Sequence, residues 1–285
     1  MVAGTTSRLA TLITALLVYV CGFATHRLCA QSSQLPPNEL VRRVIENELK
    51  AEDQDHSHWM FRLETEDKHG QKEVNRVVET KDGDVKLPLV LSGQPVSERQ
   101  KQEALQKLSR NPQSMRQGLK DKNKDAEQSQ RLLKILPDAF IFRYGKRQGS
   151  LVQLDFKPNP KFHPNNRESE VFHAMAGELW LDDKNDRLAG ISGTLMQRVK
   201  FGGGFLGRLE KGGTFEVKQQ RIQLGYWELT VLNVEMKGKA LFFKTISVHQ
   251  RFLRSEFKLV PNDLTLQSAI EMLKKPAESE QVARY

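Results

Sequence analysis

The chain has very little cysteine, with only Cys21 and Cys29 among its 285 residues. Both lie within residues 1–30, which carry the features of a removable leader. Without those residues no thiol remains, and this excludes disulfide bonds, cysteine nucleophiles and thiolate metal sites. The fold must then be held by its hydrophobic core, and the remaining stretch of about 255 residues is long enough to bury one.

Long hydrophobic runs are also scarce. The one clear run, Leu9–Ala24, follows Arg8 and precedes small residues, which is the layout of a secretory signal peptide. Its 16 residues fall short of the roughly 20 needed to cross a bilayer. We expect cleavage near Ala30 and export to the periplasm or cell envelope, with a retained membrane anchor as the alternative.

Acidic residues are fewer than basic ones, at 35 against 44, so the formal net charge is +9. Loss of Arg8 and Arg27 with the leader leaves 42 minus 35, or +7. An exported basic protein meets anionic lipid head groups and acidic envelope polymers. The charge therefore favours an anionic membrane surface over nucleic acid as a partner.

The mature chain is predicted to begin with a short linker, 31–37, and an amphipathic helix over Asn38–Ala51, because its apolar residues recur at helical spacing. Strand-like runs follow at 59–65, 73–80 and 85–91, separated by polar, glycine-containing turns. We expect these strands to pair as hairpins.

The segment 97–136 is rich in Gln, Lys, Glu and Arg and is predicted to be helical. Ser97 and Gln100 form the pattern of a capping box, and Asn111-Pro112 should divide the segment into two helices. Residues 120–131 hold one apolar side chain, Ala126. We interpret this charged helical insertion as either a solvent-bridging arm or a mobile one.

From residue 139 the sequence changes to short alternating runs punctuated by Gly, Asn, Asp and Pro, which favours an antiparallel meander. The expected strands are 139–144, 150–156, 174–181, 187–201, 213–220, 223–236 and 240–252. A helix at 264–274 lies within a C-terminal segment, 261–285. Apolar residues on both faces of the last two strands predict that parts of both sheet faces are covered.

Three short segments predict a strand that ends in Asp, a polar turn and a returning strand that contains a glycine. They are Gly177–Asp182, Asp186–Gly190 and Arg198–Phe201. Together with the element order, this resembles the periplasmic lipoprotein-carrier superfamily of LolA, LolB and RseB type. The resemblance implies an α+β fold over 38–260. Its strongly curved antiparallel sheet, a half-barrel, would have helices on the concave face and an apolar cavity for acyl chains.

Nine apolar strand residues are the candidates to line such a cavity, with ordinary core packing as the alternative for each. They are Trp180, Leu195, Phe215, Trp227, Leu229, Val231, Phe242, Phe243 and Ile246. Four glycines, Gly202, Gly203, Gly204 and Gly207, are candidates for a mobile flap at its mouth or a plain connection between strands. Their G-x-G-x-x-G pattern leads into a strand, whereas a dinucleotide site needs a helix.

The remaining motifs predict neither a metal site nor a catalytic site. The His56-Ser57-His58 pair has no thiolate to complete a metal site, and Asp182–Asp186 is predicted to be a hairpin tip because EF-hand spacing is absent. No G-x-S-x-G elbow occurs. We therefore expect no catalytic residues, no cofactor and no metal.

The sequence favours a non-enzymatic envelope protein that binds an acyl chain, a lipid or a lipid-modified protein. The first alternative is a periplasmic interaction or stress-sensing module that uses the 97–136 helices to bind an envelope protein. The second is a hydrolase of unrecognised type.

Overall fold

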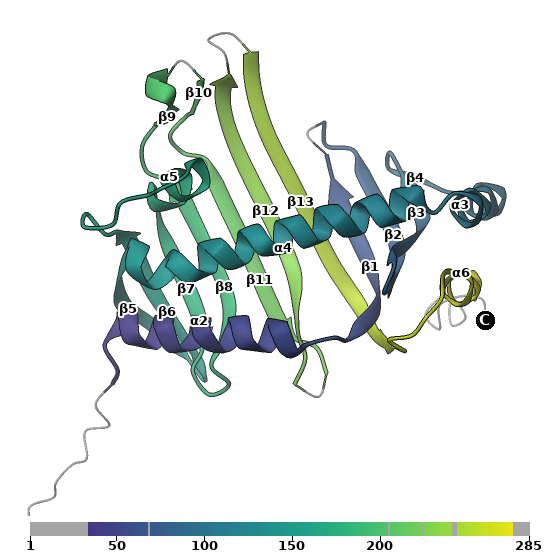
Figure 1. Ribbon diagram of the computed structural model, residues 1–285, viewed down its shortest axis with the longest axis horizontal. Coiled ribbons are helices and arrows are strands. Elements are labelled where there is room, and N and C mark those ends of the chain that lie inside the picture. Colours follow the sequence, from purple (N-terminus) through teal and green to yellow (C-terminus); the bar gives the residue numbers. More distant parts are fainter. Residues whose placement is uncertain (1–33, 68, 205, 224, 241–243, 276–285) are drawn as a thin grey trace, which may run out of the picture. The chain divides into compact units, whose positions relative to one another are not determined.

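The computed structural model describes residues 34–275 except 68, 205, 224 and 241–243 (Figure 1). Contacts group Pro37–Tyr285 into one compact unit. The expected signal peptide, its cleavage site, and Phe242 and Phe243 lie outside the described residues. In the described part, no helix combines the length and apolar character needed to cross a membrane.

The described residues form a mixed α+β structure with a large antiparallel sheet that is not closed, which confirms the fold class at this level. The main path of the sheet runs β4-β3-β2-β1-β13-β12-β11-β8-β7-β6-β5, and β10 pairs with β9 and β12. The 13 strands are β1 (His58–Glu66), β2 (Lys72–Thr80), β3 (Gly83–Leu91), β4 (Gln94–Pro95), β5 (Phe140–Gln148), β6 (Leu151–Pro158), β7 (Met175–Asp182), β8 (Arg187–Leu195), β9 (Val199–Phe201), β10 (Gly207–Leu209), β11 (Thr214–Arg221), β12 (Trp227–Ala240) and β13 (Lys244–Val260). The five described α-helices are α2 (Pro37–Gln54), α3 (Glu98–Arg110), α4 (Gln113–Ala139), α5 (Arg167–His173) and α6 (Leu266–Lys274).

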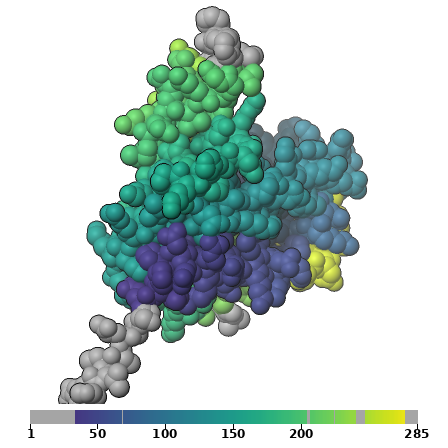
Figure 2. Space-filling model, turned by 60° about the vertical axis from the view of Figure 1, so that its left-hand side comes forward, coloured from purple at the N-terminus to yellow at the C-terminus, as the bar shows by residue number. Residues whose placement is uncertain are grey.

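Helices α2 and α4 lie side by side on one face of the sheet, which we call the α4 face (Figures 1 and 2). Successive strand residues point to opposite faces, and β2 shows the consequence. Val77 packs with Trp59 and Phe61 on the α4 face. Val78, one residue further on, packs with residues of α3 and α6 on the opposite face. Both faces of the sheet are therefore covered at β2.

The main core lies between α2, the C-terminal end of α4 and strands β5 to β8. Helix α2 buries Leu40, Val41, Val44 and Ile45, whose spacing puts them on one side of the helix. Leu136 of α4 is also fully buried in this core. The periodicity that predicted the first helix therefore also identified the side that packs.

Helix α4 crosses the α4 face and joins two of the hydrophobic clusters of the described residues. It is 27 residues long, which corresponds to about 40 Å. Met115 near its start is buried in the smaller core with α3 and α6, and Leu136 near its end is buried in the main core. Of residues 116–125 between them, all but Leu119 are exposed. The charged segment is thus a solvent-bridging helix, and the break at Asn111-Pro112 separates α3 from α4 as predicted.

One expected strand is divided, two are displaced along the chain, and one helix was not predicted. The strands expected at 223–236 and 240–252 lie at Trp227–Ala240 and Lys244–Val260. The expected strand 187–201 is divided into β8 and β9 by Met196–Arg198, after which the chain turns back as β10. Helix α5 was not predicted, because seven residues are too few to show a helical period. Its start is nevertheless marked by a capping box between Asn166 and Ser169.

Candidate functional site

An apolar strip runs over three neighbouring strands on the α4 face. Residues directly opposite in an antiparallel pair point to the same face. The register joins Phe215 to Val234 and Val217 to Leu232, and it joins Leu232 to Phe252 and Met236 to Val248. We call these side chains the β11–β13 strip: Phe215, Val217, Leu232, Val234, Met236, Val248 and Phe252.

The β11–β13 strip is only partly covered by the rest of the protein. None of its seven side chains is fully buried, and Val248 is 41% exposed. Phe215, Val217 and Met236 pack at the margin of the main core, which places the strip on the α4 face. Strands β12 and β13 extend past α4 toward β9 and β10 (Figure 1). Strands β12 and β13 therefore carry a part of this face that α4 does not cross.

Arg254 lies next to Phe252 on the same face of β13. Its guanidinium carbon is 5.0 Å from the ring centre of Phe61 and 5.1 Å from that of Phe252. These distances are typical of cation–π contacts. The Nε atom of Arg254 is buried and has no hydrogen-bond partner among the described residues. An unpaired donor thus lies at one end of the apolar strip.

Lys122, in the exposed middle of α4, reaches down to the sheet. Its Nζ lies 2.6 Å from Glu79 Oε1 and 3.6 Å from Asp84 Oδ1, and the backbone N–H of Trp59 donates to Glu79 Oε2 at 3.1 Å. Burial alone would lower the pKa of Lys122, but the carboxylates of Glu79 and Asp84 outweigh it and raise the pKa. Lys122 is therefore a charged link between α4 and strands β2 and β3.

Glu228 of β12 belongs to the same group of charges. Burial raises its pKa to about 7, and repulsion from Glu79 acts in the same direction. The Arg254 guanidinium opposes this rise by attraction. Glu228 therefore titrates near neutral pH, next to the arginine at the end of the strip.

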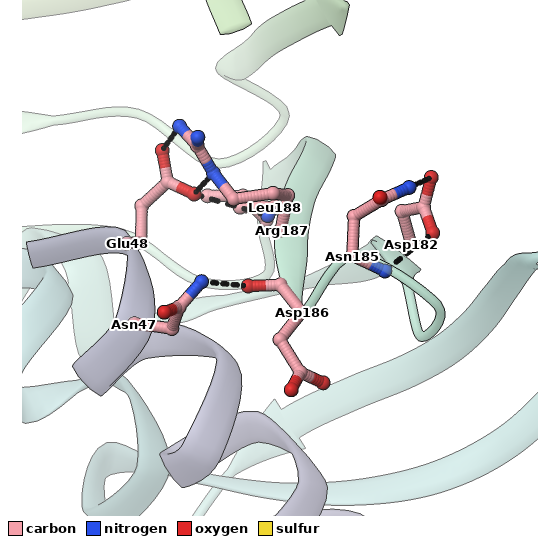
Figure 3. Close-up of polar contacts among 7 residues, drawn as sticks. All are labelled: Asn47, Glu48, Asp182, Asn185, Asp186, Arg187 and Leu188. Carbon is pink, nitrogen blue, oxygen red and sulfur yellow. Dashed lines mark hydrogen bonds and ion pairs between the residues drawn. The ribbon is translucent and has the colours of Figure 1, made fainter. Parts of the chain in front are cut away.

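A buried ion pair fixes α2 to the start of β8 (Figure 3). Arg187 donates from Nε and Nη2 to the Glu48 carboxylate at 2.8 and 3.0 Å, and the Leu188 N–H donates to the same carboxylate at 3.2 Å. Asn47 adds a bond from Nδ2 to the carbonyl oxygen of Asp186 at 2.9 Å. These bonds set the position of α2 on the sheet.

A pocket of about 540 Å³ lies where the end of α2 meets the β11–β12 and β13–α6 connections. Its wall includes Arg187, whose guanidinium carbon is 5.5 Å from the Trp227 ring centre. Asp55, Tyr226 and Leu259 also line it. The lining mixes polar and apolar groups and favours no single ligand.

The sequence candidates for a cavity whose side chains the structure describes lie in several different places. Leu195 is fully buried in the main core, Phe215 belongs to the β11–β13 strip, and Trp227 lines the pocket. Trp180 and Val231 point to the opposite face, since their neighbours Leu179 and Leu232 point to the α4 face. The others are Leu229, which is partly buried, Ile246, whose backbone pairs with Gly238, and Phe242 and Phe243, which are not described.

The glycine segment connects β9 to β10. Gly202–Gly204 form a short 3-10 turn in which Gly203 has φ 66°. Gly207, with φ 147°, pairs with Phe201 and with Ala240 of β12. A connection between strands is confirmed, and movement of this segment as a flap stays a prediction.

The aspartates at Asp182–Asp186 form the hairpin tip that the sequence predicted. Asp182 Oδ1 accepts bonds from the backbone N–H groups of Lys184 and Asn185, and its Oδ2 accepts from the Asn185 amide. The carboxylate of Asp182 is thus used within its own turn (Figure 3).

Sequence reasoning missed the charged group formed by Glu79, Lys122, Glu228 and Arg254. Only Arg254 carried a signal, because it continues the alternation that begins at Phe252. The others lie on separate elements up to 175 residues from it, and strand register brings them together. Comparisons of the chain with protein-family models, with curated proteins and with solved structures find no match.

Proposed function

We propose that this chain is a non-enzymatic, exported envelope protein that holds an acyl chain, as a lipid or as part of a lipid-modified protein. The observation that carries the proposal is the β11–β13 strip, seven apolar side chains on one sheet face that the protein's own helices leave partly open. A soluble domain exposes a contiguous apolar surface at some cost, and such surfaces are typical of binding sites.

A hydrocarbon chain is the ligand that such a surface fits best. Each methylene group removed from water contributes about 0.8 kcal/mol, so a long chain along the strip gains enough to offset its loss of freedom. The α+β order and the antiparallel sheet are compatible with the half-barrel of the lipoprotein-carrier superfamily. In this proposal the sheet curves around the ligand and α4 closes over it.

Release would then require movement of α4. The middle of α4 is held to the sheet by the contacts of Lys122 with Glu79 and Asp84, and its neighbouring residues are exposed. The stretch 116–125, between the buried Met115 and Leu136, can move away from the sheet without exposing either core. The proposed exit path therefore runs between α4 and β12–β13.

The test is native mass spectrometry of the full chain after gentle purification, with two matched variants. Val248 and Leu253 are 41% and 42% exposed, but they point to opposite faces of β13. We expect bound lipid in the wild type and in Leu253→Asp, and its loss in Val248→Asp. Equal lipid in both variants would contradict the proposed site. A wild type that carries no lipid and takes up none when it is added would contradict the function.

A further inference from the structure

We propose that Arg254 binds the carboxylate of a single long-chain fatty acid whose tail lies along the β11–β13 strip. This inference rests on the proposed function and names its ligand. Its basis is that a buried guanidinium nitrogen without a hydrogen-bond partner lies beside the β11–β13 strip, whose apolar side chains are incompletely covered.

The guanidinium of Arg254 is held in place before any ligand arrives. Phe61 and Phe252 contact it at 5.0 and 5.1 Å. Aromatic stacking engages the faces of a guanidinium and leaves its in-plane N–H donors free of the rings. The Nε donor is buried without a partner, which is unfavourable. A ligand therefore reaches it when the side chains that cover it move aside, and the ligand then supplies the missing acceptor. A carboxylate does so, because it pairs with an arginine edge through two parallel hydrogen bonds.

Among the neighbouring charged residues, Arg254 is the one suited to bind a carboxylate. Lys122, the other cation nearby, is already paired with Glu79 and Asp84. Glu228 interacts electrostatically with Arg254, but burial raises the pKa of Glu228 to about 7, so its carboxyl group is partly protonated near neutral pH. Arg254 is therefore the cation of this group that keeps an unused donor. An anionic head group is favoured there over a neutral one.

The length of the strip selects a long chain. Arg254 and Val248 are six residues apart on β13, which corresponds to about 20 Å along a strand. An extended alkyl chain of about 16 carbons covers that distance, given carbon–carbon bonds of about 1.5 Å. Phe252 and Val248 lie on this path on β13, on either side of the polar Gln250. The continuous apolar path is on the paired strand, through Leu232, Val234 and Met236.

The experiment compares delipidated full-length protein binding palmitate and hexadecanol, which share chain length and differ in the charged head. Titration calorimetry in dilute detergent-free buffer measures both. We expect palmitate to bind at least 10-fold more tightly than hexadecanol to the wild type. Arg254→Ala should lose 10- to 100-fold in palmitate affinity and less than 3-fold in hexadecanol affinity, while Arg254→Lys should recover part of the loss.

Arg251→Ala is the matched control, because Arg251 is 62% exposed, faces the opposite side of β13 and lies 3.8 Å from Glu66. It removes the same charge and should leave palmitate affinity unchanged. Equal losses in the two alanine variants would overturn the inference, as would equal binding of palmitate and hexadecanol by the wild type. The proposed function would survive those results if both ligands still bound and Val248→Asp abolished binding. Failure of both ligands to bind would contradict both proposals.

Discussion

At the scale of single residues, Glu228 shows how the fold changes ordinary chemistry. In water its carboxyl group would be ionised above pH 5. In the folded chain its pKa is about 7, because burial and the neighbouring Glu79 disfavour the charged form. The folded state therefore holds a proton that the unfolded state has released between about pH 4.5 and 7, and stability falls as pH rises through that window.

Glu228→Gln should remove this penalty. We expect the variant to match the wild type near pH 4.5 and to exceed it at pH 8 by about 1–2 kcal/mol in free energy of unfolding, a value reduced for partial solvent access. Urea denaturation at both pH values measures the difference. The exposed Glu73→Gln substitution is the control and should show no such growth. An advantage for Glu228→Gln that is equal at both pH values would contradict the assignment.

Single residues also show what the sequence could not reveal about the candidate site. Phe215 is a sequence candidate, and it belongs to the β11–β13 strip because the register pairs it with Val234. Trp180 and Val231 alternate equally well but point to the opposite face. Alternation identifies which residues share a face of one strand, whereas which face is covered depends on the helices.

At the scale of elements, one buried ion pair adds to the apolar packing that holds α2 on the sheet. The side chains of Glu48 and Arg187 are 7% and 15% exposed, and Glu48 also accepts from a backbone N–H of β8. Removing one partner leaves the other charge buried without compensation. The α2–β8 contact is therefore more sensitive to a polar substitution than the ion pairs on the surface.

Glu48→Gln should lower the free energy of unfolding by about 3 kcal/mol, because Arg187 loses its counter-charge. Asp138→Asn is the comparison, since the Arg42–Asp138 pair is about half exposed at both partners. It should cost less than about 1 kcal/mol. Chemical denaturation measures both variants at one pH. A loss for Glu48→Gln no larger than that for Asp138→Asn would show that the ion pair does not hold α2.

Elements with a clear periodicity were predicted well, and short ones were not. The helix at 38–51 and the three strands after it match α2 and β1 to β3 closely. The capping box at Ser97 and Gln100 is formed as expected. Helix α5 and the β9–β10 hairpin were missed because each holds too few residues to show a period.

At the scale of the whole molecule, the sheet, the main core and the bridge of α4 should differ in local stability. Strands β6 and β7 pair on both sides and bury Leu154 and Leu179 completely. The middle of α4 has little packing to protect it, and β4 is a two-residue edge strand. Opening free energies rise with the buried apolar contacts that an opening disrupts.

Native-state hydrogen exchange should show that order. We expect the slowest exchange in β6 and β7, intermediate exchange around Leu136, and faster exchange at 116–125 although both stretches belong to α4. Mass spectrometry of peptic fragments resolves these regions. Uniform protection along α4 would mean that the helix behaves as one rigid unit with the sheet. It would also remove the basis for its movement during ligand release.

The sequence by itself determined the α+β class, most elements, the break between α3 and α4, and the polar character of the bridging helix. Those properties follow from local periodicity, capping and turn chemistry, which act within a few residues. The tertiary structure decided which sheet face α4 covers and which apolar residues form the β11–β13 strip. It also brought Lys122 to Glu79, and Arg254 to Phe61. Such contacts join residues far apart in the chain, and register and packing fix them only once the whole sheet has formed.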